Sequence, residues 1–396
     1  MMRIIRPIAT VALSVLATFL YAQAPAFVRG ADVSWCTEME ASGKFFYNEA
    51  GEQTEMMTLL RQCGLSAVRL RVWVNPEEAY GAWCDKADVV AKARRAKAQG
   101  LAVMVDFHYS NFFADPGRQT KPSAWAALSA DGLKQAVGSH TKEILSALKA
   151  EGIEPAWVQV GNETRSGMVW DNGKIDWNKN GSAAWAGYVA LSNAGYDAVK
   201  SVVPQAKVIV HIDKGPEDNA WFYKAFKQYG GKFDMIGLSH YPESDWKNEN
   251  AKTAANIQTL AEQFGVPVMI VETGYSSSNE TLAGQVMSDF IGRIKNLSQC
   301  AGAFYWEPEV YAWWKPSYYS TLGWNAYNKG AFTAQGRPSA ALKPFFGPTD
   351  AISSVHDTDE SQCQTYDLSG RVVSSRQQGL VINVKGHTAH KVLRKL

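Results

Sequence analysis

The chain has 396 residues, of which 46% are hydrophobic and 20% are charged. This composition suits a soluble globular enzyme with one large domain and room for a small appendage. The formal net charge of +2 argues against nucleic acid or another polyanion as the partner.

The first residues predict a signal peptide over residues 1–24. Arg3 and Arg6 form a positive start, residues 8–20 are apolar, and the letters AQA at 22–24 fit a small-x-small cleavage site. The apolar run is too short to cross a bilayer comfortably, so no membrane span is expected. Export into an oxidising space is expected, with the protein secreted, periplasmic or held at the cell surface. The chain has five Cys, and this odd number leaves at least one of them unpaired within the chain.

Residues 25–347 show strand-like and helix-like segments in alternation, which predicts a (β/α)8 TIM barrel of the α/β class. Glycines that follow a helical pattern and precede an apolar run, such as Gly64 and Gly265, fit helix C-termini. A doubly wound open sheet is the alternative, but no GxGxxG follows the first strand. Strands are expected at 28–35, 67–74, 101–108, 157–161, 207–212, 233–239, 266–271 and 302–306, and helices at 52–63, 86–99, 130–151, 183–203, 219–229, 252–264 and 282–297.

The long connections follow the strands, as expected where the strand-to-helix loops build the active face. The connection at 307–340 is rich in Trp and Tyr, and it predicts either an aromatic wall over a cleft or a hydrophobic plug that closes the barrel. Residues 348–396 differ in character and predict a short β-rich C-terminal appendage. Its TYDLSGRVV segment at 365–373 reads as strand, turn and strand, and resembles the sorting-type tails of exported bacterial proteins.

Two predicted strands end in a glutamate, Glu163 after the fourth and Glu272 on the seventh. Glycoside hydrolysis uses two such carboxyls, roughly 5 Å apart when the second acts as a nucleophile. The proton donor needs burial beside another carboxylate to raise its pKa. The nucleophile needs hydrogen-bond donors that keep it ionised, and Arg71, His240 and Tyr241 are the candidates. A single such glutamate would more simply be a salt-bridged strand end, but two at these strands favour catalysis.

Motifs through nearly the whole barrel resemble glycoside hydrolase family 53, the endo-β-1,4-galactanases of a clan with catalytic acids on strands four and seven. The QVGNE and VETGY motifs that carry the two glutamates are shared widely in that clan, whereas DPG at 115–117 with KP at 121–122 is more specific. The further matches are GADVS at 30–34, RLRVW at 69–73, DFHYS at 106–110, FADPG at 113–117, KPSAW at 121–125, GLSHYP at 237–242 and YWEP at 305–308.

The resemblance implies roles for individual residues. Glu163 would be the acid/base, Glu272 the nucleophile, and Asn162 a partner of the sugar 2-hydroxyl. Trp306 would form the floor of the central subsite. The remaining cleft residues would be Asp106, His108, Asp115 and Trp125, although His108 is equally interpreted as a core histidine with a hydrogen-bond partner.

The family often has an aromatic residue at the position of His240, so the surroundings of the nucleophile and the pH dependence are expected to differ here. Some members also hold a structural calcium between the loops after strands seven and eight. Loops 276–282 and 307–331 lack a dense acidic cluster, so a calcium site is not readable, no metal ligands are assigned and no cofactor is expected to be required.

The function predicted from these features is retaining endo-β-1,4-galactan hydrolysis by a monomer that acts on type I arabinogalactan side chains of pectin. A β-mannanase or endoglucanase of the same clan is the nearest alternative, since it would share both acids. A sugar-binding protein without catalysis, and an adhesin in which the appendage does the work, are alternatives of other classes. The presence of both Glu163 and Glu272 argues against them.

Overall fold

The structure is a computed structural model that describes residues 27–76 and 83–347, and beyond them the backbone of four strands in the appendage. The chain divides into two compact units, one up to Gly347 and one from Pro348 onwards. The predicted signal peptide and its cleavage site lie outside the described residues, as does Cys363.

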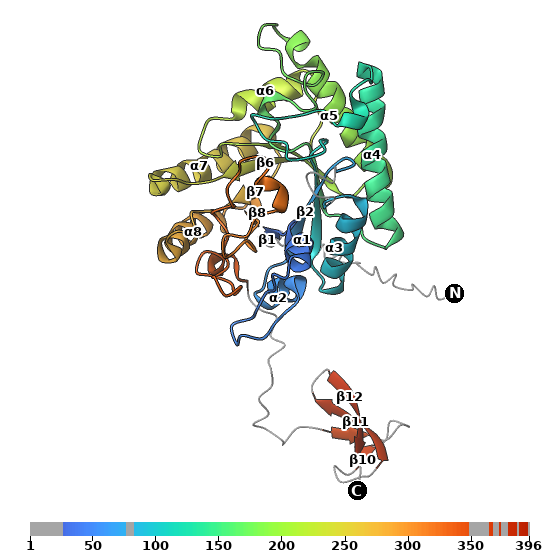
Figure 1. Cartoon of the computed structure of the whole chain (residues 1–396), viewed down its shortest axis with the longest axis vertical. Coiled ribbons are helices and arrows are strands. Elements are labelled where there is room, and N and C mark those ends of the chain that lie inside the picture. Colours follow the sequence, from blue (N-terminus) through green and yellow to red (C-terminus); the bar gives the residue numbers. More distant parts are fainter. Residues whose placement is uncertain are drawn as a thin grey trace, which may run out of the picture. The chain divides into compact units, whose positions relative to one another are not determined.

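The first unit is a closed barrel of eight parallel strands, each paired with its neighbours in sequence order, and β1 also pairs with β8 (Figure 1). The predicted (β/α)8 barrel is therefore confirmed. Its strands are β1 (Val28–Asp32), β2 (Ala67–Val72), β3 (Ala102–Phe107), β4 (Trp157–Val160), β5 (Lys207–Ile212), β6 (Met235–His240), β7 (Val268–Thr273) and β8 (Cys300–Trp306).

Helices surround the barrel and alternate with its strands (Figure 1). They are α2 (Met56–Gln62), α3 (Lys86–Ala98), α4 (Ala130–Ala150), α5 (Ser182–Val202), α6 (Ala220–Gln228), α7 (Trp246–Phe264) and α8 (Glu280–Ile294), with short 3-10 turns η2 (Ser123–Trp125), η3 (Thr164–Ser166), η4 (Ser317–Tyr319) and η5 (Lys343–Phe345). A short helix α1 (Cys36–Ala41) was not predicted; it lies between the strand expected at 28–35 and the helix expected at 52–63. Helix α7 begins six residues before its predicted start, because its first turns are polar and lack apolar periodicity.

Side chains alternate along each strand, so every second residue faces the barrel interior. At the amino-terminal end the interior is filled by an apolar cluster that includes Met104, Ile209, Met235 and Phe304. Toward the carboxyl ends of the strands the same faces carry buried polar groups, among them Arg69. The apolar end closes the barrel, and the polar end forms the base of the site.

The second unit is a four-stranded antiparallel sheet in the order β10-β9-β11-β12. Its strands are β9 (Gln364–Tyr366), β10 (Val372–Val373), β11 (Gly379–Lys385) and β12 (Thr388–Arg394). The strand-turn-strand predicted at 365–373 corresponds to β9 and β10.

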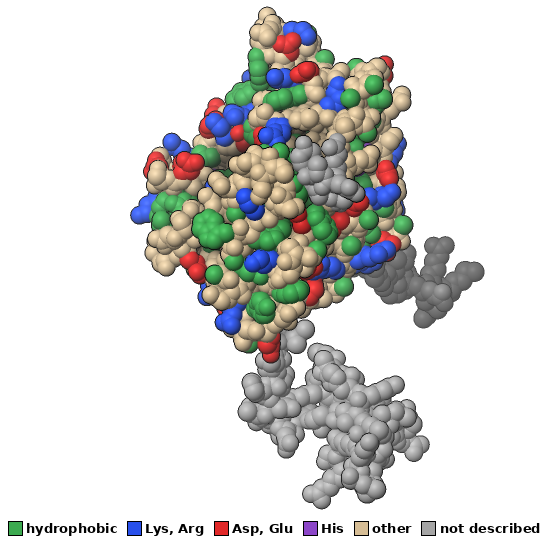
Figure 2. Space-filling model, in the orientation of Figure 1, with side chains coloured by type: hydrophobic (Ala, Val, Ile, Leu, Met, Phe, Trp, Pro, Cys, Tyr) green, Lys and Arg blue, Asp and Glu red, His purple; other side chains and the backbone are tan. Residues whose placement is uncertain are grey.

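Cys36, Cys63, Cys84 and Cys300, the cysteines among the described residues, are free thiols. Within the part of the chain that the structure describes, no helix is both long and apolar enough to cross a membrane. Figure 2 shows positive and negative side chains interspersed over the visible face of the barrel, in keeping with the small net charge.

Candidate active site

The backbone after β4 turns sharply to present Glu163. Gly161 has a φ of +88°, and a Cβ there would lie 2.5 Å from the Thr164 side chain, so only glycine fits. Glu163 itself has a φ of +46°, a left-handed conformation that non-glycine residues seldom adopt. Strained backbone of this kind is concentrated at functional sites. The turn directs the Glu163 carboxyl into a cavity rather than along the strand.

The Glu163 carboxyl is half-buried and accepts a hydrogen bond from Ser239 Oγ at 2.7 Å. Ser239 in turn lies 2.8 Å from His211 Nε2. The single hydroxyl proton of Ser239 goes to Glu163, so Ser239 Oγ accepts from His211 Nε2, which therefore carries the ring proton. His211 Nδ1 then accepts from the Glu163 backbone N–H at 3.3 Å, and it also lies 3.0 Å from Gln159 Nε2 and 3.1 Å from Asn162 Oδ1. The chain His211–Ser239–Glu163 therefore donates in one direction and fixes one oxygen of the carboxyl.

The Glu272 carboxyl is buried and has stronger donors. Its Oε1 lies 2.8 Å from an Arg69 guanidinium nitrogen, and its Oε2 accepts from the Tyr241 hydroxyl at 3.0 Å. Both oxygens are thus held by groups that favour the ionised form.

The two carboxyls differ in acidity for identifiable reasons. Burial raises the pKa of Glu163 well above its usual range, and the charge of Glu272 raises it further. Burial also raises the pKa of Glu272, to about 7, but there the guanidinium of Arg69 and the hydroxyl of Tyr241 oppose the rise. Glu272 is therefore the first of the two to ionise, and Glu163 retains its proton.

Arg69 connects the base of the site. Its guanidinium also contacts Asp32 at 2.6 Å and Asp106 at 2.9 Å, and its Nε donates to Gln159 at 2.6 Å. One fully buried cation thus joins side chains from β1, β3, β4 and β7. A buried ion network with several hydrogen bonds is rigid, and it fixes Glu272 with respect to the neighbouring strands.

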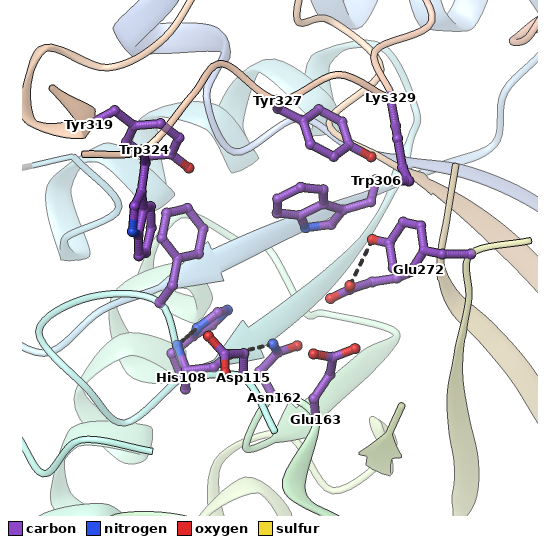
Figure 3. Close-up of a pocket in the computed structure, with 13 residues that line it drawn as sticks. His108, Asp115, Asn162, Glu163, Glu272, Trp306, Tyr319, Trp324, Tyr327 and Lys329 are labelled. Atoms are coloured by element: carbon purple, nitrogen blue, oxygen red, sulfur yellow. Dashed lines mark hydrogen bonds between the residues drawn. The ribbon is translucent and has the colours of Figure 1, made fainter. Parts of the chain in front are cut away.

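Glu163 and Glu272 face each other across a cavity of about 300 Å3 (Figure 3). Aromatic rings form one side of this cavity: Phe113, Trp306, Tyr319, Trp324 and Tyr327. The remaining lining residues are His108, Ala114, Asp115, Asn162, Tyr241 and Lys329. An apolar ring surface opposite convergent polar groups suits a sugar, which offers both an apolar face and hydroxyls.

The two expectations for the connection at 307–340 each describe part of it. Tyr319, Trp324 and Tyr327 line the cavity as a wall. Trp314 and Tyr318 are buried behind it and pack as a plug, whereas Trp313 is exposed.

The structure brings several predicted substrate-binding residues to the cavity: Asn162, His108, Asp115, Tyr241 and Trp306. Asn162 Oδ1 accepts from Arg69 at 2.9 Å and Nδ2 donates to the Ala114 carbonyl at 2.8 Å, which leaves one N–H of the amide for a ligand. His108 also has the partners of a core histidine, because Nε2 lies 2.9 Å from Asp106 and Nδ1 accepts from the Ala114 N–H.

The other predicted residues lie outside the cavity lining. Asp106 lies beneath it, fully buried against Arg69 and His108. Arg71 pairs with Glu307 at 2.6 Å and packs against aromatic rings, the nearest being Phe113 at 4.5 Å. The guanidinium that reaches the predicted nucleophile is thus that of Arg69.

Trp125 and His240 are buried in the layer between the barrel and its helices. Trp125 packs against Tyr109 and His140. His240 Nε2 lies 2.7 Å from Asn250 Oδ1, and its ring packs against Phe290 at 4.3 Å. Burial lowers the pKa of His240 to about 4, so this histidine is neutral where the catalytic carboxyls titrate.

Sequence reasoning missed Ser239, His211 and the part played by Arg69. Alternation along β6 could have found Ser239. Met235 belongs to the interior cluster, so Ser239 and Tyr241 share its face while His240 points away. Across the described ranges, no group of three or more His, Cys, Asp or Glu is arranged to hold a metal ion.

The site has two facing carboxyls with unequal hydrogen-bond partners, and aromatic rings lie beside them at the mouth of a (β/α)8 barrel. These features are typical of a glycoside hydrolase. The comparisons with known proteins agree with this class and narrow it. The model of glycosyl hydrolase family 53 matches residues 28–345, and the chain belongs to that family.

Individual relatives cover most of the chain. A Niallia circulans protein without an assigned function is 36% identical over 320 residues, which are 74% of this chain and 85% of that protein. An endo-beta-1,4-galactanase of Bacillus subtilis is 30% identical over 360 residues, which are 81% of this chain and 80% of that protein. A solved fungal beta-1,4-galactanase is 28% identical with a TM-score of 0.69, and the match covers 80% of this chain and 98% of that one.

Proposed function

We propose that the protein is a retaining endo-β-1,4-galactanase that hydrolyses type I arabinogalactan side chains of pectin. The observation that carries this proposal is the unequal environment of the two facing carboxyls. Glu272 is held ionised by Arg69 and Tyr241, whereas Glu163 has only the Ser239 hydroxyl and a higher pKa. The galactan specificity is supported by the named relatives of the family.

In the first step, the Glu272 carboxylate attacks the anomeric carbon while Glu163 gives its proton to the departing glycosidic oxygen. The bond to the leaving chain breaks, and a glycosyl ester forms on Glu272. In the second step, Glu163 accepts a proton from water, the water oxygen attacks the anomeric carbon, and Glu272 is released as a carboxylate. The free N–H of Asn162 would bond the sugar 2-hydroxyl, where stabilisation increases as positive charge develops.

We propose further that the enzyme acts as an exported monomer that needs no cofactor. The signal-peptide pattern of residues 1–24 supports export. In the two steps described above, Glu163 makes both proton transfers and Glu272 supplies the nucleophile, and this supports a reaction without a metal.

The test is hydrolysis of purified β-1,4-galactan compared with β-mannan and carboxymethyl cellulose. Galactan should be depolymerised quickly with a rapid fall in viscosity, as expected for internal cleavage. Glu163→Gln and Glu272→Gln should each remove most of this activity while binding of galactan persists. Faster hydrolysis of mannan or cellulose would favour another member of the clan, and near-normal rates in either variant would refute the assignment of the two glutamates.

A further inference from the structure

Two tryptophans are exposed on the barrel away from the cavity described above. Trp177, in the connection between η3 and α5, is 58% exposed, and Trp221, on α6, is 44% exposed. Their ring centroids are 5.9 Å apart with an interplanar angle of 61°. Trp177 also packs edge-on against the buried Trp185 of α5, at 6.2 Å. Helices α5 and α6 lie next to each other in Figure 1. We call Trp177 and Trp221 the tryptophan platform.

A hollow of about 460 Å3 adjoins Trp177. Its polar lining includes Asp171, Lys174, Asp176, Asn178 and Lys179, and it shares no lining residue with the catalytic cavity. The two carboxylates and two ammonium groups balance, so the hollow suits an uncharged ligand that is rich in hydrogen-bonding groups.

The backbone that carries the platform is tightly packed. The carbonyl of Asn172 lies 2.0 Å from where a Cβ on Gly187 of α5 would stand, so glycine is required for this close approach. The same segment is joined to itself by a bridge between Gly167 and Lys174. The ring of Trp177 itself is held on one side by its edge-on contact with the buried Trp185, which reduces the entropy lost when a ligand binds to it.

We propose that the tryptophan platform is a second polysaccharide site, which binds a stretch of the same β-1,4-galactan chain that the cavity cleaves. This inference rests on the proposed function for the identity of the polysaccharide. A β-galactopyranose unit has an apolar face that can stack on an exposed indole, and hydroxyls that can bond the charged and amide groups of the hollow. The balanced charge of the hollow fits this neutral polymer.

Trp177 and Glu163 both belong to the stretch of chain that follows β4. The segment 164–182 that carries Trp177 begins directly after Glu163. A long galactan chain held at the platform is at a raised effective concentration for the cavity, whereas a short oligosaccharide that fills only the cavity gains nothing. The platform should therefore act on the KM for long chains and leave kcat unchanged.

The test uses the full chain carrying Glu272→Gln, so that galactan is bound but not consumed. Its migration is measured by affinity electrophoresis in gels that contain β-1,4-galactan. Adding Trp177→Ala and Trp221→Ala should weaken retardation about tenfold, since each lost aromatic contact is of the order of the aromatic pair energies measured in proteins. Phe45→Ala is the matched control, because Phe45 is a similarly exposed aromatic, at 40%, on another part of the barrel.

The same double substitution in the active enzyme should raise KM for long galactan about tenfold and leave kcat/KM for short galacto-oligosaccharides unchanged. Thermal melting checks that the variant is folded, and the single Trp221→Ala variant, on the helix surface, gives a milder version of the same test. An equal loss on short and long substrates would overturn the inference, because it would place the platform's effect in the cavity.

The outcomes for the platform and for the proposed function are separate. If the unmodified protein hydrolyses galactan and the double variant binds galactan as tightly as its parent, the platform inference is overturned while the proposed function stands. If the substitutions instead change the oligomeric state in gel filtration without changing galactan binding, the platform is a protein interface and the inference is again overturned. Failure of the unmodified protein to hydrolyse galactan would overturn the proposed function and the identity of the ligand together.

Discussion

Tyr241→Phe removes one hydroxyl that contacts Glu272 and changes almost nothing else. The hydroxyl donates to Glu272 Oε2 at 3.0 Å and favours the carboxylate over the acid. A hydrogen bond to a charged, buried group contributes about 1.5–3 kcal/mol, and 1.36 kcal/mol corresponds to one pKa unit. Removal of the hydroxyl should therefore raise the pKa of Glu272 by about one to two units.

The direction of the effect on rate follows from the role of Glu272 as a carboxylate. Activity falls as pH falls through the pKa of Glu272, so a higher pKa moves the acid limb of the kcat/KM profile upward. On that limb, at any fixed pH, the variant should be about ten- to a hundredfold slower. On the plateau the loss should be much smaller, and the basic limb, which reports Glu163, should not move.

The assay is a pH profile of kcat/KM on galactan for wild type and Tyr241→Phe. Tyr223→Phe is the control, because its buried hydroxyl bonds the carbonyls of Val210 and Gly237 and does not line the cavity. An acid limb that stays in place while the whole profile drops would refute the electrostatic reasoning, since it would leave Tyr241 only a positioning role.

Two further substitutions test the pKa shifts of Glu163 and Glu309. Ser239→Ala removes the donor that lowers the pKa of Glu163, so that pKa should rise and the basic limb of the kcat/KM profile should move to higher pH; an unmoved basic limb would contradict this. Glu309 is fully buried, and burial together with the charge of Glu307 raises its pKa well above the usual value. The folded state thus holds this proton more tightly than the unfolded state, and stability is lost as pH rises above the unfolded pKa. Glu309→Gln should abolish that loss, so its melting temperature should gain on wild type progressively as pH rises above the unfolded pKa of a glutamate. A difference in melting temperature that stays constant as pH rises would contradict a raised pKa for Glu309.

The barrel was predictable because its signals are local. Most strands are apolar runs, most helices end at a glycine or a polar turn, and eight such units alternate. The β-rich appendage was predicted from turn residues between short apolar runs. Helix α1 was not, since its six residues make less than two helical turns and are too few to show a helical periodicity.

The roles of the functional side chains were harder to predict. A strand pattern shows which face of the sheet a side chain points to, but not how far along the barrel axis it lies or what it contacts. Arg69 and Arg71 alternate onto the same interior face, and sequence alone does not say which of them reaches Glu272. The side-chain contacts decide it: the Arg69 guanidinium meets Asp32, Asp106 and Glu272, whereas Arg71 pairs with Glu307. The sequence also did not show which loop residues line the cleft. Trp125 belongs to a loop motif, yet its side chain packs into the core.

The proposed mechanism makes Glu272 the nucleophile and Glu163 the acid/base of a retaining galactanase. Its most direct measurement is to trap the intermediate with an activated 2-fluoro-galactoside or 2-fluoro-galactobioside and to map the labelled peptide by mass spectrometry. One glycosyl group should be found on the peptide that contains Glu272, and Glu272→Gln should not be labelled. A label on Glu163, or turnover of galactan to products of inverted anomeric configuration, would contradict the account.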